Sequence, residues 1–373
     1  MNIIVQEVQE VQKGTGALKV MVKDSIDIQG MKTMAGSQAL MQSQAAPANA
    51  EVVDRILAAD CQITAKTNLH ELAFGITGIN HTFGTAINPK YPELIPGGSS
   101  SGSAAAIAAG LADFTLGTDT GGSIRMPAAC CGVYGLKPTF GRVSRAGVHP
   151  ASSSLDCVGP FANSVDMIES AMQIIDPTFH AQAELAQAPK LAWLNVVADS
   201  AVIETIQQYL TQANLTASAE TLKGFEAAFD AGMQIINYEN WQAYGELTQT
   251  GLLGADVNGR LLKAADTTLA QVKQAEQVRA DFTAELDALL AQYDALILPT
   301  LPQLPPKLAD AENTVAFLNL TALVRPFNLS GHPAISVPLQ TEQGQPVGLQ
   351  IVAKRNADEY LCALAKYIVS AAQ

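Results

Sequence analysis

Residues 96–139 read PGGSSSGSAAAIAAGLADFTLGTDTGGSIRMPAACCGVYGLKPT, and this stretch says most about the fold and its chemistry. It contains two Gly-Gly-Ser elements, Gly97-Gly98-Ser99 and Gly121-Gly122-Ser123. Glycine pairs permit positive φ angles and close approach of a ligand to the backbone. Consecutive N–H groups in such a turn can hold an anion or an oxyanion. One such element is more often a structural turn, but two that flank an alanine-rich helix predict a functional site.

Strand and helix patterns alternate around this stretch. The segment ALKVMVKDSID (17–27) predicts a strand entering a loop, residues 51–59 predict a helix, and residues 61–66 predict the next strand. Residues 75–102 are rich in Gly, Asn, Pro and Ser, which is typical of a functional loop. From Ser103, SAAAIAAGLADF predicts a helix of small residues. We therefore expect an α/β fold, with a mixed, largely parallel central sheet covered on both faces by helices.

The rest of the chain continues these patterns. Residues 181–290 are rich in Ala and Gln with helical periodicity and no chemical motif. The segment DALILPTLP (294–302) predicts a buried strand, while PAISVPL (333–339) and PVGLQIVA (346–353) predict paired strands. Because the sequence shows no repeat and no charged linker, we expect one domain over residues 1–373. Its expected parts are a core (15–175), a mainly helical part on the substrate side (181–290), and C-terminal strands with a helix (291–373).

Composition excludes several classes of protein. The chain of 373 residues is 48% hydrophobic and 15% charged, which excludes a disordered protein. No apolar run approaches the roughly 18 residues that a membrane-spanning helix needs. The net charge of 22 − 35 = −13 disfavours nucleic-acid binding. The first residues carry acidic groups and no apolar core of a secretory signal, and the five scattered cysteines include no CxxC pair. We therefore expect a cytoplasmic protein with reduced, mostly buried thiols.

Motifs for metal and cofactor binding are missing as well. The five histidines give no HxxxH or HExxH pattern, no Walker loop is present, and no GxGxxG follows a strand. We expect no metal and no cofactor. A Ser-His-Asp triad has no obvious members, since no histidine lies in residues 96–139 and His70, His81 and His332 are better explained as satisfied or solvent-facing side chains. Cys130 and Cys131 are expected in the core.

Taken together, these motifs resemble the signature of the amidase signature family of serine amidohydrolases. The resemblance rests on GGSS-x-GS, GTDTGGSIR and the P-x-x-x-CG-x-x-GLKPT segment, all within residues 96–139. It extends to VKDSIDIQG and AKTNLHELAFG before that stretch, and to SLDCVGPFANSVD, ALILPT, FNLSGHPAISVP and PVGLQIV after it. Nearly the whole chain is covered apart from residues 181–240. Lys23 lies unusually near the N-terminus, where many members carry a longer helical stretch that often builds a dimer contact. A homodimer is one of the expected assemblies.

The resemblance implies a catalytic triad of Lys23, Ser99 and Ser123. Ser123 would be the nucleophile, Ser99 a bridging serine after a cis peptide bond, and Lys23 the final base. A serine hydroxyl needs a positioned base, and a lysine can serve only if burial keeps it neutral. Lys23 follows apolar VMV, which suits burial, although the adjacent Asp24 offers an alternative ion-pair partner. A lone lysine at a strand end is more often a surface charge.

The resemblance also assigns neighbouring residues. The backbone N–H groups of four residues would hold the oxyanion: Thr120, Gly121, Gly122 and Ser123. Asp119 and Arg125 are expected to be a buried structural pair that braces the loop. Ser100 is expected to hydrogen-bond within the triad network, and Met126 to face the substrate pocket.

The family resemblance implies an amidohydrolase that cleaves the C–N bond of a small carboxylic amide through an acyl-enzyme on Ser123. The alternative is a glutaminase-type component of a glutamine-dependent transamidation complex. In such proteins the position of Met126 tends to be Gln, which favours the first interpretation. We expect a small-molecule amide as the partner, and neither nucleic acid nor a membrane.

Overall fold

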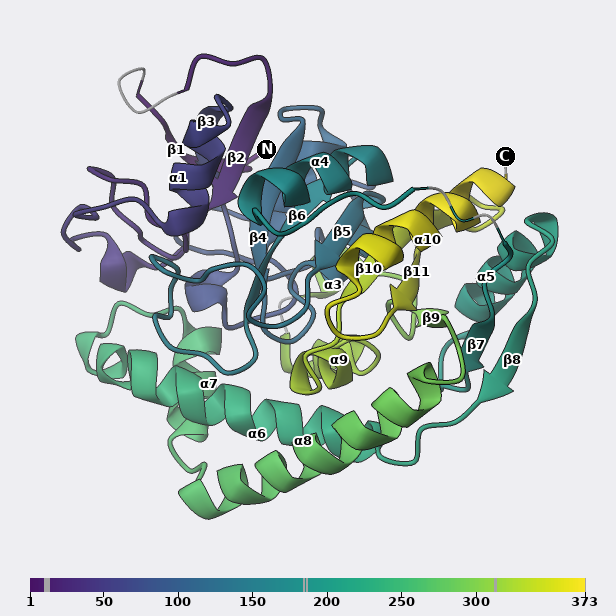
Figure 1. Cartoon of the computed structure of the whole chain (residues 1–373). Coiled ribbons are helices and arrows are strands. Elements are labelled where there is room, and N and C mark those ends of the chain that lie inside the picture. The colour runs from purple at the N-terminus through teal and green to yellow at the C-terminus, as the bar shows by residue number, and fades with distance from the viewer. Residues whose placement is uncertain (10–13, 184, 186, 312–313, 373) are drawn as a thin grey trace.

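In the computed structural model, which describes residues 1–9, 14–183, 185, 187–311 and 314–372, strands from the whole length of the chain form one sheet (Figure 1). The sheet has eleven strands in the order β1-β3-β2-β4-β6-β5-β10-β11-β9-β7-β8. The strands are β1 (Ile4–Glu7), β2 (Lys19–Lys23), β3 (Gln62–Thr67), β4 (Phe114–Asp119), β5 (Tyr134–Lys137), β6 (Cys157–Ala162), β7 (Leu191–Leu194), β8 (Ala217–Glu220), β9 (Ala295–Pro299), β10 (Ala334–Gln340) and β11 (Pro346–Val352).

The predicted mixed sheet is confirmed, but it is not largely parallel. The parallel pairs β3-β2, β2-β4, β9-β7 and β7-β8 lie toward its two ends. The centre runs antiparallel from β4 through β6, β5, β10 and β11 to β9, and β1 adds an antiparallel edge. For the β10–β11 pair the physical reason is their short connection, which only an antiparallel pair permits. The predicted pairing of PAISVPL with PVGLQIVA is confirmed by these two strands.

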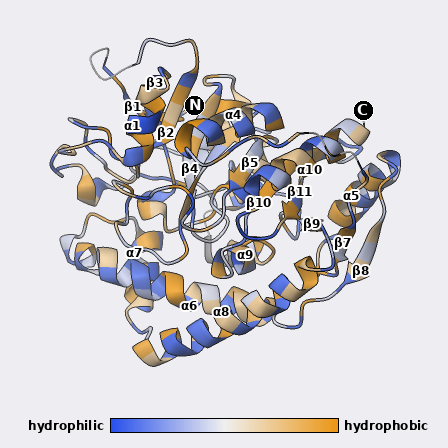
Figure 2. Cartoon of the chain, in the orientation of Figure 1, coloured by the Kyte–Doolittle hydropathy of each residue, from blue (hydrophilic) through white to orange (hydrophobic). Residues whose placement is uncertain are grey.

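Helices cover both faces of the sheet (Figure 1). One hydrophobic core forms where α1, α4, α5 and α10 pack on one face, and two others form where α2 and α3, and then α6 to α9, cover the opposite face. Hydrophobic and hydrophilic residues alternate along the long helices α6 and α8 (Figure 2). The helices are α1 (Glu51–Ala58), α2 (Ser101–Ala108), α3 (Arg125–Cys131), α4 (Val165–Ile175), α5 (Ser200–Gln212), α6 (Phe225–Tyr244), α7 (Ala255–Ala264), α8 (Leu269–Leu290), α9 (Arg325–Leu329) and α10 (Asp358–Ala371), with short 3-10 helices at Gln38–Leu40, Glu71–Ala73, Gly245–Thr250, Leu308–Asp310 and Thr314–Thr321.

Two predicted elements differ from the observed ones. The helix expected over SAAAIAAGLADF ends at Ala108, because Gly110 takes a left-handed φ of 68° and Phe114 already begins β4. The segment 181–290 is mainly helical where described, but it also contributes the strands β7 and β8. The irregular loop predicted over residues 75–102 forms neither an α-helix nor a strand up to Ser100, but its last two residues, Ser101 and Gly102, already belong to α2.

The fold places the two Gly-Gly-Ser elements near the carboxyl ends of strands β2 and β4. Strands β2 and β4 are parallel neighbours, so their carboxyl ends meet at the same edge. Lys23 ends β2 and Asp119 ends β4. Ser99 lies two residues before α2, and Ser123 lies two residues before α3. The lysine and both serines therefore approach one another through three separate connections.

Two further findings concern the chain as a whole. All five cysteines are free and buried, which confirms the prediction of buried thiols. Among the described residues, no helix combines the length and the apolar character that crossing a bilayer requires.

Candidate active site

Lys23 is a fully buried lysine that contacts hydroxyl groups. Side chains alternate across a strand, so Val20 and Val22 face the core under α1 and α4 while Met21 and Lys23 face α2 and α3. The Lys23 Nζ atom donates to Ser99 Oγ over 2.7 Å and to Thr118 Oγ1 over 2.8 Å. The lysine side chain is 0% exposed, so both contacts lie in a desolvated environment.

Asp24 does not pair with Lys23. Its carboxylate contacts Lys66 Nζ of β3 over 2.8 Å and accepts a hydrogen bond from Gln6 Nε2. The backbone explains this choice, since Asp24 follows Lys23 and points to the opposite side. The alternative ion pair that the sequence offered is therefore excluded by the fold.

The environment of Lys23 favours its neutral form. Burial lowers the pKa of Lys23 to about 7, although the negative charges of Asp156 and Asp119 act in the opposite direction. A lysine with a pKa near neutral holds an unprotonated fraction that can accept a proton. Lys23 has the property that the resemblance requires of a base.

The first Gly-Gly-Ser element has the predicted cis peptide bond between Gly98 and Ser99. Ser99 is 1% exposed and accepts the Lys23 hydrogen bond. The hydrogen bonds of the Ser100 hydroxyl among the described residues go to the backbone of Thr118 instead of to Lys23 or Ser99. The Ser100 Oγ atom donates to the Thr118 carbonyl over 3.2 Å and accepts from the Thr118 N–H over 3.3 Å, so Ser100 ties the start of α2 to β4.

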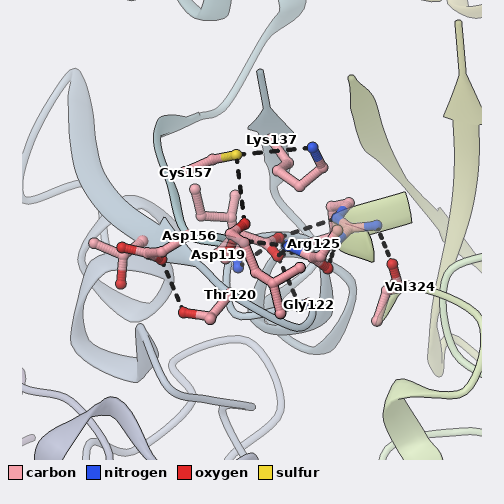
Figure 3. Close-up of polar contacts among 12 residues, drawn as sticks. Asp119, Thr120, Gly122, Arg125, Lys137, Asp156, Cys157 and Val324 are labelled. Atoms are coloured by element: carbon pink, nitrogen blue, oxygen red, sulfur yellow. Dashed lines mark hydrogen bonds and ion pairs between the residues drawn. The ribbon is translucent and has the colours of Figure 1, made fainter. Parts of the chain in front are cut away.

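The second Gly-Gly-Ser element forms a turn that Asp119 braces (Figure 3). The Asp119 carboxylate accepts hydrogen bonds from the N–H groups of Gly122 at 2.7 Å, Ile124 at 3.1 Å and Arg125 at 3.3 Å. Gly122 has a φ of 118°, and a Cβ atom there would lie 2.3 Å from the Val324 side chain. Only glycine fits this position.

These bonds change the expected set of oxyanion donors. The Gly122 N–H already donates to Asp119 Oδ1, which leaves it less suited than the other three N–H groups to bind an oxyanion. The hydrogen bonds of the described residues leave the N–H groups of Thr120, Gly121 and Ser123 unused. The turn therefore offers three candidate donors.

Asp119 and Arg125 form the predicted buried pair. The Arg125 Nη2 atom lies 2.9 Å from Asp119 Oδ1, both side chains are 0% exposed, and Arg125 also donates to Gln350, Asn328 and the Val324 carbonyl (Figure 3). Burial opposes ionisation of Asp119, but the Arg125 charge and the hydrogen bonds that Asp119 accepts from Arg125 and Asn328 hold its pKa well below its usual range. The pair anchors the turn to α9 and β11.

Ser123 lines a cavity near the surface. It is 9% exposed, and its hydroxyl makes no hydrogen bond with any residue that the structure describes, including Ser99. The cavity is also lined by Thr120, Gly121 and residues of α6 and α7. The Ser123 hydroxyl is therefore open to a ligand.

Met126 does not line this cavity, contrary to prediction. Its side chain is 0% exposed and packs in a hydrophobic cluster with Ile76, Ile95 and Leu320. Met126 lies in the first turn of α3, a short helix in which every residue is buried.

Sequence reasoning missed several residues around the site. Thr118 is the second acceptor for Lys23. Asp156 accepts from Thr120 Oγ1 over 2.8 Å and from Arg145 Nε over 2.9 Å, so it holds the turn from the other side (Figure 3). Arg260 and Arg325 line the Ser123 cavity. Thr118 lies within GTDTGGSIR and Asp156 within SLDCVGPF, so proximity to a motif was the available signal for these two residues.

A serine, a histidine and an aspartate do meet elsewhere. His332 lies 3.0 Å from Ser330 Oγ through Nδ1 and 3.1 Å from Asp287 Oδ1 through Nε2. The N–H groups of Ser330 and Gly331 donate to the Pro326 and Asn328 carbonyls, so neither of these two groups is free to bind an oxyanion. The Asp287 carboxylate also pairs with Arg355. The arrangement is structural, so the chemistry stays with the Ser123 cavity.

Comparison with known proteins agrees with this geometry. The family model described as Amidase matches residues 16–202 and 197–362. The A subunit of the glutamyl-tRNA(Gln) amidotransferase of Halobacterium salinarum is 35% identical, with 91% of this chain and 92% of that protein covered. A crystal structure of an amidase superposes with a TM-score of 0.86 at 31% identity, over 95% of this chain and 84% of that one. The corresponding amidotransferase component of Thermotoga maritima superposes with a TM-score of 0.83 at 30% identity, over 98% and 86%.

The chain belongs to the amidase family. The sequence resemblance and the expected sheet flanked by helices are thereby confirmed. Membership makes it an enzyme that acts on amide C–N bonds.

Proposed function

We propose that this amidase-family member hydrolyses a carboxylic amide through an acyl-enzyme on Ser123, giving an acid and ammonia or an amine. The observation that carries the proposal is the 2.7 Å contact between Lys23 Nζ and Ser99 Oγ in a fully buried environment. A buried lysine whose partners are hydroxyls rather than a carboxylate has no structural ion pair to explain it. A role as a base does explain it.

The proposed reaction has two steps, formation of an acyl-enzyme and its hydrolysis, and Ser123, Ser99 and Lys23 take part in both. The Ser123 Oγ atom attacks the amide carbonyl carbon. In the substrate complex its hydroxyl turns to donate to Ser99 Oγ, and the proton passes through the Ser99 hydroxyl to neutral Lys23. The proton then returns to the amide nitrogen, the C–N bond breaks, and an ester on Ser123 remains. A water molecule attacks the ester by the same proton route, and Ser123 is regenerated with the acid.

The turn supplies the electrostatic part of catalysis. The N–H groups of Thr120, Gly121 and Ser123, which no described residue uses, would bind the carbonyl oxygen on which negative charge develops. The Asp119–Arg125 pair and Asp156 position this turn without contacting the substrate.

A second candidate is the glutaminase-type component of a glutamine-dependent transamidation complex. The relatives named as glutamyl-tRNA(Gln) amidotransferase components favour it, since they match at 30–35% identity over 90% or more of the chain. Both candidates share the attack of Ser123 on a carboxamide. They differ in whether the ammonia is released or passed to another protein.

The test of the proposal is Ser123→Ala. We expect this variant to lose turnover of every amide and labelling by a fluorophosphonate probe, with an unchanged circular dichroism spectrum. Ser101→Ala is a matched control, because the hydroxyl of this neighbouring buried serine has no hydrogen-bond partner among the described residues and Ser101 does not line the cavity. Turnover of Ser123→Ala near that of the wild type would refute the assignment.

The purified chain by itself separates the two candidates. Release of ammonia from a panel of simple amides, without any partner, supports the independent amidohydrolase. Ammonia release from glutamine that requires partner proteins and tRNA supports the transamidation component.

A further inference from the structure

Residues 72–76, where the AKTNLHELAFG motif ends, form one continuous wall of the Ser123 cavity, and we call them the wall segment. The segment also adjoins the first Gly-Gly-Ser element. The His70 N–H donates to the Ser99 carbonyl over 2.9 Å, and a Cβ atom on Gly98 would lie 3.1 Å from the Ile76 carbonyl oxygen. The position of the wall segment therefore bears on both serines of the candidate site.

The wall segment begins in a strained backbone conformation. Leu72 has a φ of 53° and Ala73 has a φ of 54°, in the left-handed region that residues with a Cβ atom rarely adopt. They are the only two adjacent non-glycine residues with a positive φ in the part of the chain that the structure describes. Such a conformation persists only where surrounding contacts hold it. The contacts of this segment therefore matter for the shape of the cavity.

Glu71, directly before the wall segment, supplies one of these contacts. It is 6% exposed, and its carboxylate accepts from Ser37 Oγ over 2.6 Å and from the Gly254 N–H over 2.9 Å. Gly254 is the N-cap residue of α7, where the helix dipole favours a negative charge. A Cβ atom on Gly254 would lie 2.7 Å from Glu71 Oε2, so glycine is what permits this approach. The Glu71 carboxylate thus joins the start of the wall segment to the start of α7.

Two further contacts lead from the same stretch to α7. The His70 Nε2 atom lies 3.2 Å from Asp256 Oδ2, and the guanidinium carbon of Arg260 lies 4.5 Å from the centre of the Phe74 ring. A Cβ atom on Gly75 would lie 1.8 Å from His70 Nε2, so the imidazole packs directly on the backbone of the wall segment. The wall segment and α7 therefore form one unit beside the cavity.

We propose that Glu71 is a positioning residue that holds the strained wall segment against α7 and thereby keeps the Ser123 cavity in the shape that receives the amide. The inference rests on the proposed function for its substrate, but the contact itself does not depend on any reaction. Glu71 does not line the cavity, so it acts through residues 72–76. Without the contact, the strain is released and the wall segment leaves its position in part of the molecules. The apparent affinity for the amide then falls by the fraction that remains in place, while the bound enzyme reacts as before.

Steady-state kinetics with a neutral amide test this role. Glu71→Ala should raise KM by roughly 10-fold and leave kcat within about twofold. Glu71→Gln is the conservative variant and should keep KM within about threefold, because its amide oxygen can accept from the Gly254 N–H while its NH2 group donates to Ser37 Oγ. Gly254→Ala breaks the same contact from the side of α7 and keeps the carboxylate, so it should raise KM as Glu71→Ala does.

Glu285→Ala is the matched control. The Glu285 carboxylate accepts from the N–H groups of Lys223 and Gly224, the N-cap residue of α6, but Glu285 lies outside the cavity. Its loss should leave KM unchanged. Fluorophosphonate labelling to completion counts the folded active sites of every variant, so that lost protein is not read as a lower kcat. A fall in kcat with an unchanged KM in Glu71→Ala would overturn the inference, because it would make Glu71 a purely structural residue.

Ala73→Gly tests whether strain is what Glu71 opposes. Glycine adopts the left-handed φ of this position without a steric cost. The double variant Glu71→Ala with Ala73→Gly should therefore have a lower KM than Glu71→Ala by itself. A KM that is equal or higher in the double variant would overturn the inference.

Hydrogen exchange tests the contact without catalysis. The N–H groups of Leu72 and Ala73 donate to the Ala35 and His70 carbonyls. We expect these two groups to exchange at least about 10-fold faster in Glu71→Ala than in the wild type. Unchanged exchange would overturn the inference.

The two proposals fail in different ways. If exchange rises in Glu71→Ala but the wild type hydrolyses no amide, the positioning contact stands and the proposed function fails. If amides are hydrolysed with the same KM in Glu71→Ala and exchange is unchanged, the proposed function stands and the positioning role fails.

Discussion

Lys23 and Lys66 are neighbours in the sheet with opposite environments. They lie at the ends of two parallel strands, and both side chains are 0% exposed. Lys66 contacts the Asp24 carboxylate over 2.8 Å and donates to the Lys32 carbonyl and the Thr33 hydroxyl. Lys23 contacts two hydroxyls. The same residue type at the same depth is therefore a structural cation in one strand and a candidate base in the next.

The comparison shows that burial alone does not identify a catalytic lysine. A buried ion pair keeps its lysine charged because the carboxylate replaces the lost solvation. Without such a partner, burial favours the neutral form, and the pKa of Lys23 falls to about 7. Asp24 contacts Lys66 and not Lys23, and this difference in partner distinguishes the two buried lysines.

The largest expected effect that separates the two lysines is on turnover. Lys23→Met should lower kcat/KM by more than about 100-fold, because a general base contributes roughly 10²- to 10⁴-fold. Ammonia release from a neutral amide is the measurement. Lys66→Met, assayed well below its unfolding temperature, is the comparison and should retain activity within a small factor. Comparable losses in both variants would contradict the distinction.

The next largest effect is on stability, where we expect Lys66→Met to lose more than Lys23→Met. Lys66→Met leaves the Asp24 carboxylate buried without its cation, so we expect the free energy of unfolding to fall by about 3–5 kcal/mol. Urea unfolding of Lys66→Met and Lys23→Met measures the difference. The double variant Lys66→Met with Asp24→Asn removes both charges and should recover part of the loss. A greater loss in Lys23→Met would show that Lys23 is the structural cation.

The pH dependence gives a graded test of the Lys23 pKa. Below about pH 7 the lysine is protonated and cannot accept a proton, so kcat/KM for a neutral amide should fall about tenfold per pH unit and level off above about pH 8. Rates from about pH 5 to 9 are the measurement, with Lys66→Met expected to follow the same profile. A flat wild-type profile would mean that the proton goes elsewhere.

The same pKa has a consequence for stability. An unfolded lysine titrates near about 10.4, so between about pH 7 and 10 the unfolded chain binds more protons than the folded chain. The free energy of unfolding of the wild type should therefore rise with pH in this window relative to Lys23→Met.

The smallest expected effect is that of metal removal. The described residues contain no group of three or more His, Cys, Asp or Glu side chains placed to hold a metal ion. The proposed reaction uses backbone N–H donors and Lys23 instead. Activity should survive dialysis against EDTA and should not rise with zinc, magnesium or manganese. If activity were lost on chelation and restored by one particular metal, Lys23 would not be the base that acts without a metal.

The local motifs were readable from the sequence because they depend on the backbone. Gly97-Gly98-Ser99 and Gly121-Gly122-Ser123 required turns wherever the chain placed them, and strands such as β2, β10 and β11 followed from short apolar patterns. The resemblance then assigned roles to Lys23, Ser99 and Ser123. The Asp119–Arg125 brace was also predicted, since the two residues flank the turn.

The tertiary structure decided what depends on contacts between distant segments. The sequence offered Asp24 as a partner for Lys23, but β3 brings Lys66 to Asp24. It assigned the Gly122 N–H to the oxyanion, but Asp119 occupies it. It placed Met126 in the pocket, whereas α6, α7 and α9 supply the cavity lining with Arg260 and Arg325. Local sequence determines backbone conformation, but the partner of a buried charge is set by packing between residues far apart in the chain, and this packing is what distinguishes a base from a structural cation.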